Sequence, residues 1–259
     1  MPATAVIFDL DDTLIPEENS EQAALLAACA LARARFGIPE EELKATVAAR
    51  AAQLWRTNPV YETSDQIGVS CYEALWGRFD AADEHLGVLR DWVPAFRREV
   101  WRGSLSKHGV DDGAFATEIG RAFQAQRRAR ISSFNDAAPV LADLKKRHRL
   151  ALLTNGAPSV QREKLDGCGL AVFFELVVIS GDIGIGKPDR RVFDHTLKLL
   201  KVRAGDAVMV GNSPKRDIAG ARNAGVRSVL IRRPGLSSGD GPSPDFVISS
   251  LEELPELLR

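Results

Sequence analysis

The chain has 259 residues, which is enough for one large domain or two small ones. Hydrophobic residues make up 45% of it, an ordinary share for a soluble globular protein. The formal net charge of −1 gives no electrostatic basis for binding nucleic acid or an acidic membrane surface, so neither partner is expected.

The cysteines and histidines are few and scattered. Cys29, Cys71 and Cys168 form no Cys-x-x-Cys pair and the four histidines are isolated, so a zinc site is not expected. An odd, low cysteine count is typical of a reducing compartment. The N-terminus has no basic segment followed by an apolar one, and no apolar run approaches ~18 residues. We therefore expect a cytoplasmic protein with no membrane partner.

Residues 4–9 are predicted to form a buried strand that runs directly into acidic residues. The strand is rich in β-branched and aromatic residues, and Asp9, Asp11 and Thr13 follow its apolar part. Carboxylates at the end of a buried strand are destabilising unless they are paired. Two of them close together suit a hard cation with oxygen ligands, or a nucleophile beside a general acid. A turn with solvated acids is the alternative.

Residues 16–134 show helical periodicity and no convincing strand. The segment after Asn19-Ser20 predicts a helix that continues to about Arg35. Pro39, followed by three glutamates, predicts the start of a second helix that runs to about Arg56. Further helices are expected near 64–79, 84–102 and 111–130.

Residues 135–259 alternate between strand and helix patterns. Apolar runs predict strands at 149–154, 176–180, 206–211, 226–231 and 245–248. Helical patterns separate them at 136–147, 157–167, 189–200, 215–224 and 251–258. The Gly/Pro/Ser-rich segment 234–244 is predicted to be a surface loop.

Alternation of strands and helices implies a parallel sheet with helices on both faces. The N-terminal strand belongs with this sheet. The predicted fold class is therefore α/β, with a doubly wound parallel-sheet (Rossmann-like) core formed by residues 1–15 and 135–259. An α-helical domain, residues 16–134, is inserted after the first strand.

Polar residues follow several of the predicted strands at their carboxyl ends. Thr154 and Asn155 end one strand, Lys187 lies beyond the next, and Asn212 follows the strand at 206–211, with Asp217 one turn later. In an open parallel sheet, ligands bind outside the carboxyl ends of the strands. Together with Asp9 and Asp11, these residues predict a site able to handle a phosphoryl group and Mg²⁺.

The segment 181–187 offers a different interpretation. It fits the Gly-x-x-x-x-Gly-Lys spacing of a nucleotide-binding P-loop. The next residue, however, is Pro188 instead of the Ser or Thr that binds Mg²⁺, and proline resists continuation of the phosphate-binding turn. The P-loop interpretation is therefore not favoured.

The chain resembles the phosphatase branch of the haloacid dehalogenase-like hydrolase superfamily. Its first motif, Asp-x-Asp-x-Thr after a strand, is matched by Asp9-Leu10-Asp11-Asp12-Thr13. The second and third motifs are matched by Thr154 and by Lys187 before Pro-Asp. The fourth, usually a Gly-Asp pair with another Asp a few residues later, is matched by Gly211-Asn212 and Asp217. The resemblance covers the whole core in the right order, and the inserted helices occupy the position of the family's cap domain.

The resemblance implies a role for each matched residue. Asp9 would be the nucleophile that forms an aspartyl-phosphate. Asp11 would protonate the leaving oxygen and then activate the water that hydrolyses the intermediate. Lys187 would hold the phosphoryl oxygens and offset the carboxylates, and Thr154 would donate a hydrogen bond to them, together with the Asn155 amide. Thr13 is expected to support the loop, and its neighbour Asp12 to face solvent.

Mg²⁺ is the cofactor that the resemblance implies. Asp9, the backbone carbonyl of Asp11, and the residues Asn212 and Asp217 would be its ligands. Asn212 stands where the family usually has Asp. Its amide oxygen can still bind the metal with one negative charge fewer, so metal affinity is expected to be lower or to depend more on Asp217.

The expected reaction is hydrolysis of a small phosphate monoester, with a small phosphorylated metabolite as partner. A phosphomutase on the same core, a dehalogenase, and a non-catalytic phosphate-binding protein are the alternatives; Asp11 argues against a dehalogenase because a halide needs no proton. Nothing in 16–134 names the substrate or the oligomeric state. Candidates for substrate contact there are Trp55-Arg56, Trp76, Trp92, Trp101 and Arg127-Arg128, with helix packing as the alternative role of each.

Overall fold

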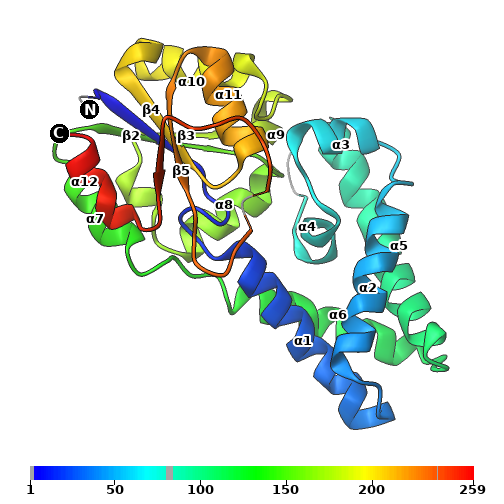
Figure 1. Cartoon of the computed structure of the whole chain (residues 1–259). Helices are drawn as coiled ribbons and strands as arrows, with labels where there is room; N and C mark the ends of the chain where they lie inside the picture. The colour runs from blue at the N-terminus through cyan, green and yellow to red at the C-terminus, as the bar shows by residue number, and fades with distance from the viewer. Residues whose placement is uncertain (1–2, 80–83, 238) are drawn as a thin grey trace. The chain divides into compact units, whose positions relative to one another are not determined.

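The computed structural model describes residues 3–79, 84–237 and 239–259, which divide into two compact units (Figure 1). The core unit comprises Met1–Glu18 and Ser132–Arg259, and the helical unit comprises Asn19–Ile131. The division falls three residues inside the predicted insertion at each end, after residue 18 instead of 15 and after 131 instead of 134. Helix α1 (Glu17–Phe36) therefore begins in the core unit and continues in the helical unit.

The described part of the core unit contains a six-stranded parallel sheet of order β3-β2-β1-β4-β5-β6. The chain moves outward from β1 to β2 and β3, then returns to the other side of β1 for β4. This is a doubly wound topology with its switch point beside β1. The strands are β1 (Ala5–Phe8), β2 (Arg149–Thr154), β3 (Leu176–Ile179), β4 (Ala207–Gly211), β5 (Arg227–Ile231) and β6 (Phe246–Ile248). The predicted α/β fold class is confirmed.

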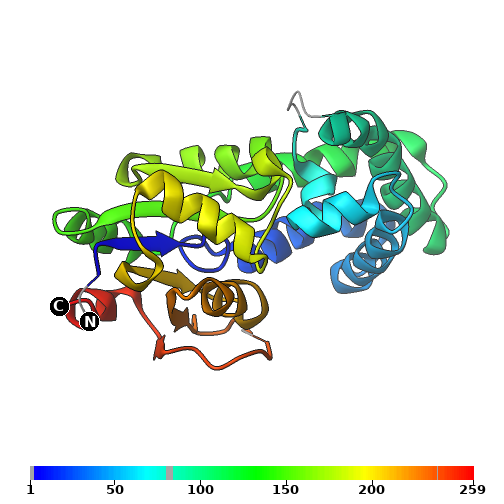
Figure 2. The ribbon, with the colours of Figure 1, turned by 90° about the horizontal axis from the view of Figure 1, so that it is seen from above.

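The two faces of the sheet bury different helices because successive side chains of a strand point in opposite directions. In β1, Val6 and Phe8 pack on the side of α7 (Ala137–Leu144) and α12 (Leu254–Leu257). Ala5 and Ile7 face α10 (Arg190–Leu200) and α11 (Ala219–Ala224). Figure 1 shows these helix pairs on opposite sides of the sheet, and in Figure 2 α10 and α11 lie over the strands.

Several core helices are shorter or more divided than the sequence predicts. The predicted helix at 215–224 begins as a π-helical turn, η3 (Pro214–Ile218), before α11 continues it. The predicted helix at 251–258 starts as a 3₁₀ turn, η4 (Leu251–Glu253). The remaining elements are α8 (Pro158–Gly167), η1 (Ala171–Phe173), α9 (Ser180–Ile183) and η2 (Ala204–Asp206), of which only α8 was predicted.

The described residues of the helical unit form helices and no strand, as predicted. Its helices besides α1 are α2 (Glu40–Trp55), α3 (Tyr61–Ile67), α4 (Cys71–Trp76), α5 (Glu84–Lys107) and α6 (Gly113–Arg128). The single helix predicted at 64–79 is two helices. Gly68 ends α3 in the left-handed conformation, and Ser70 with Glu73 forms a capping box that begins α4. No helix of the described segments has the length and apolar content to cross a bilayer.

All four tryptophans considered for substrate contact pack against other side chains of the helical unit. Trp55 contacts the rings of Trp92 and Phe96, with centroids 6.0 Å apart in each case. Trp101 contacts Phe123 and is 1% exposed. Trp76, also 1% exposed, lies under the guanidinium groups of Arg127 and Arg128. Trp76 and Trp101 are therefore packing residues.

A buried ion pair joins the loop after β1 to the C-terminal part of the core unit. Arg233 is 2.6 Å from Asp136 and donates hydrogen bonds to the Thr13 carbonyl, while its guanidinium lies 3.9 Å from the Phe134 ring centroid. Asp136 also accepts hydrogen bonds from the Ser250 hydroxyl and from the backbone amide of residue 251. Burial raises the pKa of Asp136, but these donors outweigh it and hold the pKa below its ordinary value of 3.8.

Replacing Gly220 with Ala should destabilise the core. A Cβ at this position would lie 2.3 Å from the Phe193 ring, so α11 and α10 would have to move apart. Overpacking of this kind costs about 1–3 kcal/mol, more than the helix propensity that alanine gains. Urea unfolding should show this loss for Gly220→Ala and none for Gly205→Ala, where nothing lies within 4 Å of the added carbon. Equal stability of the two variants would contradict the packing described.

Asp136→Asn should lower stability in a pH-dependent manner. Because the folded-state pKa lies below the unfolded value, the stabilisation by ionised Asp136 is present above that value and disappears as pH falls through the folded pKa. At pH 7 the loss should be about 1.5–3 kcal/mol, as for other hydrogen bonds to charged groups. The difference from wild type should shrink below about pH 4. Asp143→Asn, at an exposed ion pair on α7, should change little; a pH-independent loss for Asp136→Asn would refute the ionic role.

Candidate active site

The predicted site residues meet at the carboxyl edge of the sheet. β1 lies between β2 and β4, so Asp9, Thr154 and Gly211 end or follow three adjacent strands. A cavity of about 220 Å³ opens here within the core unit. Its lining consists of Asp9, Asp11, Asp12, Thr154, Asn155, Lys187, Asn212, Ser213, Arg216 and Asp217. The structure thus brings all seven predicted site residues to one cavity.

Lys187 lies between two buried carboxylates. Its Nζ is 2.5 Å from Asp9 Oδ1 and 2.7 Å from Asp217 Oδ1, and the lysine is 3% exposed. Burial lowers the pKa of Lys187, but the two carboxylates outweigh this and raise it, so the side chain is charged. The pKa of Asp9 is raised, mainly by burial and also by the negative charge of Asp217. Lys187 opposes this rise but does not cancel it. One ammonium group therefore lies between two acids.

Asn155 fixes the backbone of Lys187. Its Oδ1 accepts a hydrogen bond from the Lys187 amide at 2.8 Å, and its Nδ2 donates to the Lys187 carbonyl at 2.9 Å. The peptide bond between Lys187 and Pro188 is cis. The Asn155 side chain, expected to contact a phosphoryl group, is thus engaged with the residue beside it. Thr154 donates a hydrogen bond to Gln161 Oε1 at 3.2 Å.

Asp217 is held against the end of β4 by the wide turn of η3. Its Oδ2 accepts a hydrogen bond from the Ser213 amide at 2.9 Å. A Cβ on Gly211 would lie 2.3 Å from the Asp217 carboxyl group, so only glycine leaves space for the acid at this point. The π-helical turn and Gly211 together explain how Asp217 reaches Lys187. Such π-helical turns are frequent at functional sites.

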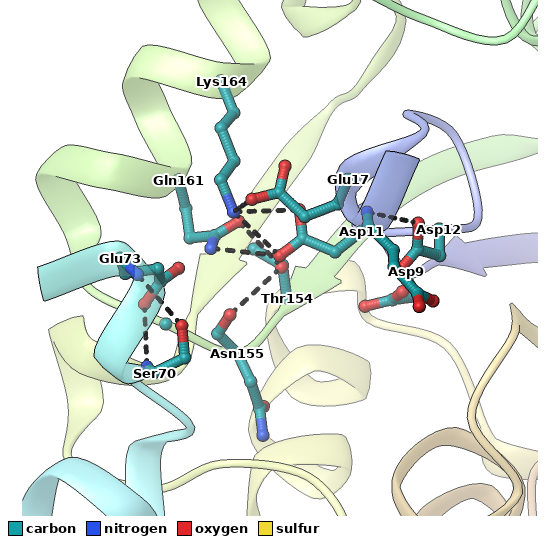
Figure 3. A network of polar contacts seen from close by, with 12 residues as sticks. Asp9, Asp11, Asp12, Glu17, Ser70, Glu73, Thr154, Asn155, Gln161 and Lys164 are labelled. Atoms are coloured by element: carbon teal, nitrogen blue, oxygen red, sulfur yellow. Dashed lines mark hydrogen bonds and ion pairs between the residues drawn. The ribbon is translucent and has the colours of Figure 1, made fainter. Parts of the chain in front are cut away.

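Asp11 is held by helix α8. Lys164 Nζ lies 3.1 and 3.0 Å from its two carboxylate oxygens, Gln161 Nε2 lies 3.4 Å from Oδ2, and Glu17 Oε1 is 2.9 Å from the same ammonium group (Figure 3). Burial raises the pKa of Asp11 to about 6, against the opposing effect of Lys164. Gln161 and Lys164 were not among the site residues predicted from the sequence. The one feature of the sequence that could have indicated them is their spacing: two polar residues three positions apart, beside the apolar Val160 and Leu165.

The loop after β1 is held by its own polar groups. The Thr13 hydroxyl donates to Asp9 Oδ2 at 3.1 Å, in line with the supporting role expected for it. Asp12 does not simply face solvent as expected. It has a positive φ of 57°, accepts a hydrogen bond from the Glu18 amide at 3.0 Å and lines the cavity. Burial raises the pKa of Asp12 to about 7.

The donor set of the cavity fits a hard divalent cation. Asp9 and Asp217 offer carboxylate oxygens, and the Asn212 side chain makes no hydrogen bond to residues 3–79, 84–237 or 239–259. Within the same ranges no three His, Cys, Asp or Glu side chains form a metal-binding cluster. A metal here would therefore need amide or backbone oxygens beside two carboxylates, and Mg²⁺ accepts such ligands.

Sequence comparison places the chain among known hydrolases. Residues 3–225 match the haloacid dehalogenase-like hydrolase family. A phosphoserine phosphatase of Thermus thermophilus is 41% identical over 250 residues, which cover 96% of each chain. The N-acylneuraminate-9-phosphatase of Rattus norvegicus is 29% identical, over 98% of this chain and 93% of the relative.

Solved structures show the same fold. The HAD-hydrolase YfnB of Bacillus subtilis, described as bound to magnesium, has a TM-score of 0.66 and 22% identity, with 100% of this chain and 99% of that chain covered. A 2-haloacid dehalogenase of Pseudomonas syringae has a TM-score of 0.61 and 28% identity, with 100% and 98% covered. The family match, the relatives and the strand-end site lead to one conclusion: the chain belongs to the haloacid dehalogenase-like hydrolases.

Proposed function

We propose that this protein hydrolyses a small phosphate monoester through an aspartyl-phosphate on Asp9. The observation that carries the proposal is the single cavity in which Asp9, Asp11, Lys187 and Asp217 meet. The phosphatase names of the relatives support the same reaction class.

Asp9 is the proposed nucleophile. Its carboxylate attacks phosphorus, the ester P–O bond breaks, and the phosphoryl group is transferred to the carboxylate oxygen. Thr13 and Lys187 hold the two oxygens of Asp9 in fixed directions, which orients the group for attack. Splitting one displacement into two steps lowers each barrier.

Asp11 is the proposed general acid and base. It lines the cavity two residues after Asp9, so its carboxyl group can protonate the departing alkoxide. The resulting carboxylate then takes a proton from the water that attacks the phosphorus of the intermediate. A proton donor at this place suits an alcohol leaving group and not a halide, which leaves without a proton.

Lys187 and Thr154 are the proposed phosphoryl-binding side chains. The ammonium group of Lys187 would stabilise negative charge that develops on the phosphoryl oxygens. The Thr154 hydroxyl, which now donates to Gln161, would turn to the phosphoryl group. Asn155 serves indirectly, because its side chain fixes the backbone of Lys187.

Mg²⁺ is the proposed cofactor, held by Asp9, Asp217, Asn212 and the backbone carbonyl of Asp11. When bound, the cation would neutralise charge on the phosphoryl group and on the carboxylates that surround it. Asp9 and Asp217 lie against the same ammonium group of Lys187, and a divalent cation would give their remaining oxygens a second positive partner.

The substrate is proposed to be a small phosphorylated metabolite, and the helical unit is proposed to select it as a cap domain. The relatives carry the names of different phosphatases, so the alcohol part of the substrate is not fixed by family membership. A panel of phosphorylated sugars, organic acids and nucleotides is the appropriate screen.

Purified protein should hydrolyse p-nitrophenyl phosphate with Mg²⁺ and lose this activity with EDTA. Asp9→Asn should reduce turnover by roughly 10³-fold or more, because an amide is a poor nucleophile, while circular dichroism stays unchanged. Asp194→Asn, at an exposed ion pair on α10, is the matched control and should retain full activity. Activity of Asp9→Asn above a few per cent of wild type would exclude Asp9 as nucleophile.

Asn212→Asp should tighten Mg²⁺ binding on the order of tenfold, because a carboxylate replaces a neutral amide oxygen at a hard cation. Asp217→Ala should weaken it. Isothermal titration of Mg²⁺ into the three proteins, alongside activity against Mg²⁺ concentration, measures both effects. An unchanged affinity for Asn212→Asp, together with a large loss for Asp217→Ala, would place Asn212 outside the coordination sphere.

A further inference from the structure

Lys164 is a buried lysine that no step of the proposed reaction uses. Its side chain is 1% exposed, yet it lies 3.0 Å from Asp11 and 2.9 Å from Glu17. A buried ion pair is a weak source of stability, because desolvation of the charges offsets most of their attraction. The placement of this lysine against Asp11 therefore calls for a role beyond stability.

The contacts of Asp11 come from one face of α8. Lys164 reaches both carboxylate oxygens, and Gln161, three residues earlier and so on the same side of the helix, donates to Oδ2 (Figure 3). Gln161 is itself oriented by the hydroxyl of Thr154 at the end of β2. The Asp11 side chain remains 29% exposed and lines the cavity. The carboxyl group is thus anchored on one side and open to the cavity on the other.

We propose that Lys164 and Gln161 are positioning residues that hold the Asp11 carboxyl group for proton transfer to the leaving oxygen. The inference rests on the proposed phosphatase function. In the first step the ester P–O bond breaks, its electron pair stays on the leaving oxygen, and that oxygen takes the proton of Asp11. Lys164 and Gln161 donate hydrogen bonds to the carboxylate that remains. In the second step water gives a proton to Asp11 while its oxygen bonds to phosphorus and the Asp9–phosphate bond breaks.

A positioning role predicts that the loss depends on the leaving group. p-Nitrophenolate departs with little help from an acid, whereas an alkoxide needs a proton. Lys164→Met keeps a similar shape and removes the hydrogen bonds. It should lower the rate of phosphoryl transfer to Asp9, measured by single-turnover quench, by on the order of 10²-fold for an alkyl phosphate that wild type hydrolyses. The effect on this first step should be much smaller for p-nitrophenyl phosphate. Arg162 lies on the same helix but pairs with Asp182 at the surface, so Arg162→Met should leave the hydrolysis rates of both esters unchanged.

A double-mutant cycle with Asp11→Asn separates positioning from a structural effect. If Lys164 acts through Asp11, Lys164→Met should cause no further loss of alkyl phosphate hydrolysis in the Asp11→Asn background. Lys164→Arg, which retains donors and charge, should restore part of the alkyl phosphate activity. An equal loss of the first-step rate on both esters, or the full loss repeated in the Asp11→Asn background, would overturn the proposal.

Two further results keep the test decisive. If circular dichroism shows that Lys164→Met is unfolded, Gln161→Leu is the variant to test. It should show the same selective loss of activity on the alkyl ester, but a smaller one. Absence of that selectivity would overturn the positioning role. Wild-type protein that hydrolyses neither ester would instead overturn the proposed function itself, whereas wild-type turnover with unselective variants would overturn only the role of α8.

Discussion

The ammonium group of Lys187 between Asp9 and Asp217 is the interaction on which the site depends. Without it, the buried carboxylate after β1 and the one in η3 after β4 would lie close together with no cation between them. Removing one partner of a buried ion pair costs about 3–5 kcal/mol. Asn155 and Gly211 serve this arrangement, because one fixes the lysine backbone and the other leaves space for Asp217. The sheet makes the arrangement possible, because the doubly wound order puts β1 between β2 and β4 and brings their carboxyl ends together.

The sequence was sufficient to predict those parts of the fold and of the site that depend on local sequence patterns. Each strand was found within about two residues, because buried parallel strands are short apolar runs bounded by turn residues. Asp9, Thr154, Lys187 and Asp217 could be assigned to one edge since residues that follow parallel strands converge there. The shape of the cavity around them could not be predicted.

What the sequence did not reveal depends on contacts between distant elements. Lys164 looks like an ordinary helix lysine, and only the packing of α8 against the loop after β1 turns it towards Asp11. The Asn155 side chain bonds the backbone of Lys187, which lies far away in the sequence, so this contact depends on the fold. The predicted helix at 64–79 is split because Gly68 adopts the left-handed conformation and ends α3. The sequence did not show this, because a single glycine can end a helix or lie within one.

The central claim is that Asp9 carries the phosphoryl group during turnover. Its most direct test is rapid acid quench of the protein with a ³²P-labelled phosphate monoester that it hydrolyses, followed by borohydride reduction and peptide mapping. We expect acid-stable, alkali-labile label during turnover, and reduction of the acyl phosphate at Asp9 alone. Full turnover with no trapped label, or with label on another residue, would contradict it.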